Sequence, residues 1–220
     1  MTRIAFLAAA AATVTAVTGG IAAAPAIFAQ DAPQMPGIQD ASRVTAGTYA
    51  LDAGHTLVKW KVSHFGFNDY FGLFGNITGT ITMDPANIEA ATFEIMIPVA
   101  EVTVASDGLK NHLLRAGKDG AAPDFFGPEP GMAQFTSTSV TKTGATSANV
   151  LGDLTLNGKT APVMMAVDFV GAGANPMNKK ETVGFHARAI MDRTQWGINY
   201  GVPMVSKDVE LTISAAFEKQ

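Results

Sequence analysis

The strongest constraint on the fold of this chain is an alternation of apolar and polar residues that recurs along most of its length. A period of two is typical of half-buried β-strands, because successive side chains point to opposite faces of a sheet. The clearest example is the apolar series Val209, Leu211, Ile213, Ala215 and Phe217. The pattern predicts eight strands, at residues 57–65, 76–83, 92–99, 133–143, 183–191 and 209–218 and in the two arms of a hairpin over 149–170.

Two local signals add a turn and a helix to these strands. Asn157-Gly158 is the dipeptide that best accepts the positive φ angles of a two-residue hairpin turn. A capping hydroxyl at Ser106 precedes Leu109 and Leu113, which are four residues apart, and this spacing predicts a short amphipathic helix at about 107–116. With no strand–helix–strand rhythm, these elements favour an antiparallel barrel or sandwich. An eight-stranded barrel is either filled by side chains or able to hold one small ligand.

The N-terminus has the three-part form of a secretory signal. Arg3 precedes an uncharged run, and small residues end at Ala29, so we expect a signal peptide over 1–29 and a mature periplasmic or secreted chain. The alternative is an uncleaved membrane anchor, because residues 4–29 carry no charge. Residues 30–47 lack an apolar period and predict a flexible arm. The remaining residues, 48–219, suit one domain without a stable membrane span.

Charge and cysteine content exclude several classes of protein. The full chain has a net charge of −4, and loss of residues 1–29 leaves 14 basic against 19 acidic side chains, or −5. No basic surface is therefore available to bind nucleic acid. The chain has no cysteine, so neither a disulfide nor a lipid-anchored lipoprotein is expected.

The sequence contains no motif typical of an enzyme or a metal site. None of the four histidines, His55, His64, His112 and His186, is paired with another at a spacing of two or four residues. Neither a Gly-x-Ser-x-Gly elbow nor a glycine-rich phosphate loop is present. We therefore predict a non-enzymatic protein with no cofactor and no metal.

Several runs, in a fixed order, resemble the YceI-like family of secreted, lipocalin-like barrels associated with polyisoprenoid lipids. The resemblance covers residues 48–219. It includes Tyr49-Ala50-Leu51-Asp52, His55-Thr56, Val62-Ser63-His64-Phe65-Gly66-Phe67, Gly72-Leu73-Phe74-Gly75, His112-Leu113, Pro123-Asp124-Phe125-Phe126, Phe135-Thr136-Ser137, Gly152-Asp153-Leu154-Thr155-Leu156-Asn157-Gly158 and Asp192-Arg193-Thr194-Gln195-Trp196-Gly197-Ile198. The chain departs from the family in having ten residues at 114–123, where the family has only a few, and in Gln195, where an acid is common.

The resemblance implies an all-β, eight-stranded antiparallel lipocalin-like barrel with one short helix. It also implies a periplasmic carrier of a polyisoprenoid or similar long-chain lipid, with a polyprenyl lipid or prenyl quinone as partner. Inward-facing side chains are the expected ligand contacts: Trp60, Val62, Ile77, Ile81, Phe93, Ile95, Phe135, Leu154, Met165, Val167, Phe185, Ala187, Leu211 and Ile213. The expected rim and lid of the pocket are His64, Phe65, Phe67, Phe71, Phe74, Leu109 and Leu113.

Some alternatives stay open at this point. The inward face mixes large residues with small ones such as Gly152 and Ala187, which suits a lipid cavity and equally a filled barrel. A filled barrel would be a ligand-free, stress-related periplasmic interaction protein. An eight-stranded outer-membrane barrel shares the signal and strand count, although two Trp and three Tyr are few for two aromatic girdles. The phenylalanine-rich stretch with glycines at 66, 72 and 75 predicts a loop or bulge.

Overall fold

The computed structural model describes residues 34–220, of which 35–220 form one unit. The predicted signal peptide and the alternative anchor both lie outside these residues. Within the described part of the chain, no helix has the length and apolarity needed to cross a membrane.

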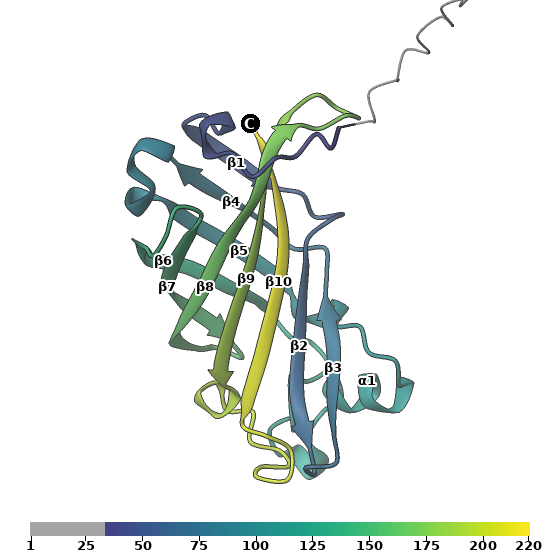
Figure 1. Cartoon of the computed structure of the whole chain (residues 1–220). Helices are drawn as coiled ribbons and strands as arrows, with labels where there is room; N and C mark the ends of the chain where they lie inside the picture. Colours follow the sequence, from purple (N-terminus) through teal and green to yellow (C-terminus); the bar gives the residue numbers. More distant parts are fainter. Residues whose placement is uncertain (1–33) are drawn as a thin grey trace, which may run out of the picture. The chain divides into compact units, whose positions relative to one another are not determined.

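Ten antiparallel strands make up the sheet of residues 34–220 (Figure 1). They are β1 (Gly47–Leu51), β2 (Leu57–His64), β3 (Asn68–Phe74), β4 (Thr78–Met83), β5 (Thr92–Pro98), β6 (Met132–Lys142), β7 (Ser147–Leu156), β8 (Lys159–Ala174), β9 (Glu181–Asp192) and β10 (Asp208–Lys219). The helix is α1 (Asp107–Leu113), and short 3-10 turns are η1 (Ala41–Arg43), η2 (Pro85–Ala90), η3 (Val99–Glu101), η4 (Lys118–Gly120) and η5 (Arg193–Trp196).

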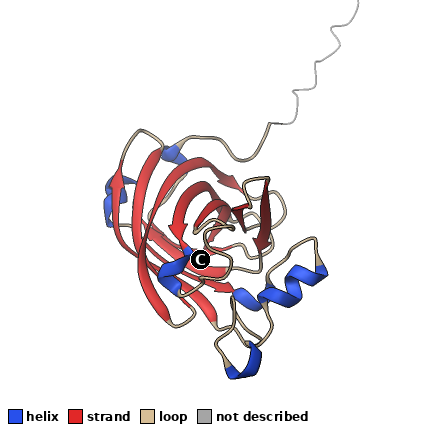
Figure 2. Ribbon diagram, turned by 90° about the horizontal axis from the view of Figure 1, so that it is seen from below, coloured by secondary structure: helices blue, strands red, loops and turns tan. Residues whose placement is uncertain are grey.

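Eight of these strands close into a barrel, which confirms the predicted fold class. Their order is β1, β4, β5, β6, β7, β8, β9 and β10, and β10 pairs back to β1. Viewed from below, the strands curve around a common centre (Figure 2). The last residues of β10 pair with β1, whereas its first half pairs with β2, over Glu210–Ser214. The hairpin of β2 and β3 therefore extends the wall at the lower end of Figure 1.

The loop or bulge expected in the phenylalanine-rich stretch is present at Gly66 and Gly75, but the prediction is wrong for residues 68–74, which form β3. The turn lies earlier, at Phe65-Gly66, where φ is 55° and 70°. Gly72 lies within the strand opposite Trp60, and a Cβ atom at this position would lie 2.5 Å from the indole ring. The glycine is thus needed for close side-chain packing and not for a break in the strand.

The predicted hairpin and helix are both present. Asn157 and Gly158 have φ angles of 50° and 71°, as the two-residue turn between β7 and β8 requires. The Ser106 hydroxyl accepts a hydrogen bond from the Leu109 N–H at 3.2 Å and caps α1. The helix ends at Leu113 and not at 116, because the chain turns there and Phe126 N–H bonds to the Leu113 carbonyl at 3.0 Å.

The described part of the arm predicted over 30–47 is bound to the barrel. Ile38 pairs with Ala172 of β8, with two backbone hydrogen bonds of 3.1 and 2.9 Å. The Gln39 side chain donates to the Phe169 carbonyl at 2.7 Å. This segment is ordered by main-chain pairing, which needs no apolar period in the sequence.

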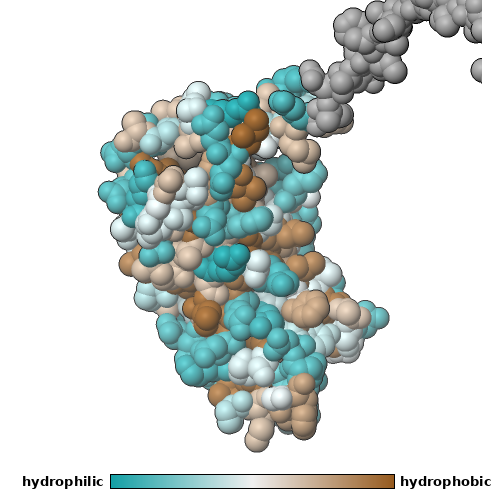
Figure 3. All heavy atoms as spheres, in the orientation of Figure 1, coloured by the Kyte–Doolittle hydropathy of each residue, from teal (hydrophilic) through white to brown (hydrophobic). Residues whose placement is uncertain are grey.

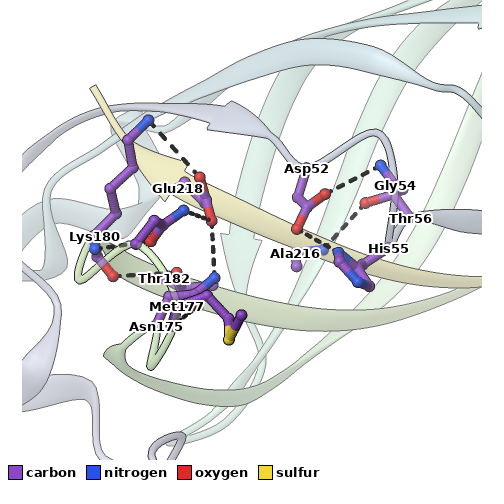
Figure 4. Close-up of polar contacts among 11 residues, drawn as sticks. Asp52, Gly54, His55, Thr56, Asn175, Met177, Lys180, Thr182, Ala216 and Glu218 are labelled. Carbon is purple, nitrogen blue, oxygen red and sulfur yellow. Dashed lines mark hydrogen bonds and ion pairs between the residues drawn. The ribbon is translucent and has the colours of Figure 1, made fainter.

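Hydrogen bonds connect the loop before β2 and the loop between β8 and β9 to the second half of β10 (Figure 4). The Thr56 hydroxyl accepts a hydrogen bond from Ala216 N–H at 3.2 Å, and Asn175 donates to Glu218 at 3.0 Å. Large side chains fill the upper half of the barrel interior, the end that holds these two loops. They include Tyr49, Ile81, Val150, Val183 and Phe217. The upper half of the barrel is thus mostly a packed core.

Candidate ligand-binding cavity

A cavity of about 770 Å³ occupies the lower half of the barrel, the half that carries α1 in Figure 1. Its walls come from β2, β3, α1, the ends of several barrel strands and the connection between β9 and β10. The side chains around it are mainly aliphatic and aromatic. Nine residues expected at the site line it: Trp60, Val62, His64, Phe65, Phe74, Leu109, Leu113, Leu154 and Leu211.

The other expected site residues do not line this cavity. Ile81, Phe93, Ile95, Phe135 and Met165 belong to the packed core or pack against it. Val167 and Phe185 line a second cavity of about 130 Å³ near η1. Ile77 and Ala187 are buried, and Ile213 is half-buried, outside the main cavity; Phe67 and Phe71 are exposed.

Gly152 shows why an inward-facing position does not by itself mean a cavity. A Cβ atom there would lie 2.3 Å from the ring of Phe135. The small residue therefore accommodates a neighbouring aromatic ring, which is how a filled barrel packs. The main empty space, of about 770 Å³, lies in the lower half of the interior, and a smaller one of about 130 Å³ lies near η1.

Two connections contribute cavity residues that the strand pattern could not identify. Phe125 and Phe126 come from the segment after α1, and residues from Ile198 to Val205 come from the connection between β9 and β10. Neither connection has an apolar period. The family-like runs at 123–126 and 192–198 were the one signal that pointed to them.

Arg193 fixes the shape of the connection between β9 and β10. Its buried guanidinium donates hydrogen bonds of 2.9 to 3.0 Å to four backbone carbonyls, those of Ile198, Tyr200, Val205 and Ser206. Burial lowers the pKa of Arg193, and the neighbouring Asp192 charge opposes that shift. This family-like arginine therefore organises a wall of the cavity.

Trp196 attaches the same connection to β7. Its buried indole N–H donates to the Leu154 carbonyl at 2.9 Å. The other tryptophan, Trp60, lines the cavity and stacks on Tyr70 with ring centroids 6.5 Å apart. Its Nε1 is buried by protein atoms and has no hydrogen-bond partner within residues 34–220. Because this N–H is buried among protein atoms, Trp60 borders the cavity with the apolar surface of its ring.

A polar cluster of His112, Arg115 and Asp124 lies between α1 and the β9–β10 connection. His112 Nε2 lies 2.7 Å from an oxygen of Asp124, to which Arg115 also donates at 3.0 Å. The hydrogen bonds from His112 and then Arg115 lower the pKa of Asp124. The His112 ring meets Phe125 and Tyr200 edge to face, at 5.1 and 4.7 Å between centroids. In the described residues, no group of three His, Asp or Glu side chains could hold a metal ion.

The Asp192 carboxylate should make the free energy of unfolding fall at acid pH. Hydrogen bonds from Lys207 and Thr194 lower the pKa of this carboxyl from 3.8 to about 2. A lowered pKa stabilises the folded state above pH 3.8, and this stabilisation is lost as the pH falls towards 2. We expect Asp192→Asn, which retains a capping oxygen, to lower the melting temperature at neutral pH, and the difference from wild type to shrink as the pH falls through about 2.

Thermal melts across this pH range test the prediction. Asp208→Asn is the matched control, because it removes an exposed carboxylate 3.3 Å from the same lysine, and it should change the melts little. A difference for Asp192→Asn that stays constant down to pH 2 would contradict the assignment.

Comparison with known proteins places this barrel among related folds. The chain is 34% identical over 172 residues to a UPF0312 protein of Ectopseudomonas mendocina, covering 77% of this chain and 86% of that protein. BcnA of Burkholderia cenocepacia superimposes with a TM-score of 0.63 at 21% identity, over 76% of this chain and 98% of BcnA. The YceI protein of Campylobacter jejuni gives 0.61 at 22% identity, over 72% and 90%.

A more distant structural neighbour is described as a polyisoprenoid binding domain, from Saccharophagus degradans. It matches with a TM-score of 0.54 at 11% identity, over 78% of this chain and 98% of that domain. At such identities the likeness shows the fold alone. The YceI-like domain model, however, matches residues 49–217. By this match, the chain belongs to the YceI-like family.

Proposed function

We propose that this protein is a periplasmic carrier that holds a polyisoprenoid or similar long-chain lipid in the 770 Å³ cavity and does not convert it chemically. The observation that carries the proposal is the cavity itself. Its volume falls in the range of about 300–1,000 Å³ that is typical of small-molecule sites. Its predominantly apolar lining suits a hydrocarbon chain, and the description of the Saccharophagus neighbour supports this ligand class.

Burial of hydrocarbon can supply the affinity. Each CH₂ group removed from water contributes about 0.8 kcal/mol, so a few isoprene units offset the cost of ordering the chain. Filling the cavity would also stabilise the fold, by about 2.7 kcal/mol when free ligand is at 100 times the dissociation constant. The signal-like N-terminus supports the periplasmic location.

The test is recovery of the natural ligand. The full chain, including residues 1–29, is expressed, and cell fractions are probed for the protein. Protein purified from the periplasm is then analysed by native mass spectrometry and organic extraction. We expect a prenyl quinone or a polyprenyl phosphate at about one molecule per chain.

Lipid-stripped protein gives a second readout. A prenyl quinone should change the fluorescence of Trp60, which lines the cavity, and Trp60→Phe should remove this change while Trp196 remains. Absence of lipid in the purified protein, together with no quinone binding by stripped protein, would favour the ligand-free interaction protein.

A further inference from the structure

We propose that the open end of the cavity docks on the surface of a phospholipid bilayer. The docking surface is an apolar lip formed by Phe65, Phe67, Tyr200, Val202 and Met204. The inference rests on the proposed function, because the lip is where a lipid ligand would pass between membrane and barrel.

The lip exposes large apolar side chains on two neighbouring turns. Phe67, Met204 and Phe65 are 90%, 60% and 52% exposed, and Tyr200 and Val202 are exposed as well. One turn is the tip of the β2–β3 hairpin, and the other is the connection between β9 and β10. In Figure 3 the lowest point of the molecule, where this connection lies in Figure 1, shows white, tan and brown spheres. Such a concentration of exposed apolar side chains is typical of an interaction surface.

Hydrogen bonds hold the two turns together. Phe65 N–H donates to the Met204 carbonyl at 2.7 Å, and Ser206 N–H donates to the Ser63 carbonyl at 2.9 Å. Arg193 holds the connection from inside by its four bonds to backbone carbonyls. The apolar side chains therefore project from a fixed backbone, and their exposure is a property of the folded state.

The lip is continuous with the cavity. Phe65, Val202 and Met204 each line the cavity and are also exposed to solvent, so its walls reach the surface at this point. A lipid that leaves the cavity here enters water unless another apolar phase covers the lip. Docking on a bilayer removes that exposure, because acyl chains then meet the mouth of the cavity directly.

Charge and size favour a bilayer over a protein partner. Residues 64–68 and 194–206 contain no Asp, Glu, Lys or Arg, so inserting the lip into a membrane would desolvate no side chain of these four types. Phenylalanine and tyrosine suit the interface between headgroups and acyl chains. Five side chains are also far fewer than the roughly 20–30 residues that each partner contributes to a stable protein interface.

The experiment places a fluorescent probe at the lip and another at the opposite end of the barrel. Phe67→Trp is compared with Met177→Trp, because Met177 is 89% exposed in the loop between β8 and β9. Both proteins, with wild type as background, are mixed with vesicles of uncharged phosphatidylcholine that carry brominated acyl chains. We expect Phe67→Trp emission to shift to the blue and to be quenched, and Met177→Trp emission to be unchanged.

Vesicle flotation supplies the matched loss of function. Phe67→Ser should lower the fraction bound to phosphatidylcholine vesicles by about fivefold or more, because a large apolar side chain no longer enters the membrane. Met177→Ser should leave this fraction unchanged. Phe67 is exposed and does not line the cavity, so Phe67→Ser should retain the wild-type melting temperature.

Two results would overturn the proposal. One is an unquenched Phe67→Trp signal at saturating vesicle concentrations. The other is binding that requires anionic lipid and is abolished by salt, which would indicate charge attraction elsewhere on the surface. Neither result depends on recovery of a lipid from the cavity, so failure of docking and failure of the carrier function are separate outcomes.

Discussion

Arg193→Met is expected to lower the free energy of unfolding by about 3 to 5 kcal/mol. The substitution removes the donors of four backbone carbonyls, and hydrogen bonds from charged groups are worth about 1.5–3 kcal/mol each without being additive. In a domain of this size, such a loss lowers the melting temperature by about 10 °C. Denaturant unfolding and thermal melts measure the effect.

Arg188→Met is the matched control for this substitution. Arg188 is an exposed arginine on β9, paired with Asp168 at 3.6 Å, so its loss should change stability by less than about 0.5 kcal/mol. Arg193→Lys keeps the charge but cannot reach all four carbonyls, so it should recover only part of the stability. If Arg193→Met kept the wild-type melting temperature, the connection between β9 and β10 would hold its shape without the arginine.

Val62→Trp is expected to fold normally and to bind lipid at least about tenfold more weakly. Val62 lines the main cavity, so the added ring enters empty or lipid-occupied space. Excluding two CH₂ groups of ligand, at about 0.8 kcal/mol each, is enough for a tenfold loss. A prenyl quinone titration and a thermal melt of lipid-free protein measure the two effects.

Val183→Trp is the same substitution in the packed half of the barrel. Val183 is fully buried within the core, so the ring should overpack it and cost about 1–3 kcal/mol or more. Equal destabilisation by Val62→Trp and Val183→Trp would mean that the lower half is also filled, which contradicts a lipid cavity. A stable Val62→Trp protein with unchanged quinone binding would place the ligand outside the barrel.

Much of the fold could be predicted because its signals are local. Alternation depends only on the pleat of each strand, so it located the strands of residues 76–99 and 132–219 to within a few residues. The Ser106 cap and the Asn157-Gly158 turn likewise depend on the conformations of adjacent residues. These local signals favour either a barrel or a sandwich, and the family resemblance indicated the closed barrel.

The sequence pattern failed where a residue is explained by a distant neighbour. Gly72 by itself indicates a break in the strand, but the Trp60 ring packs closely against it from the neighbouring strand. Ile38 has no strand signal, because its order comes from pairing with Ala172 far along the chain. Arg193 gives no sign in the sequence that four carbonyls of the following residues surround it.

Within each unbroken run of alternation, the sequence by itself determined which side chains face the inside of the barrel, since a period of two assigns every second residue to the same face. Only the tertiary structure decided which of those positions surround empty space. Phe135 and Leu154 both face inward, yet the Phe135 ring packs over Gly152 while Leu154 borders the cavity. The physical reason is that the filling of each level along the barrel axis depends on the summed volumes of side chains from strands far apart in sequence.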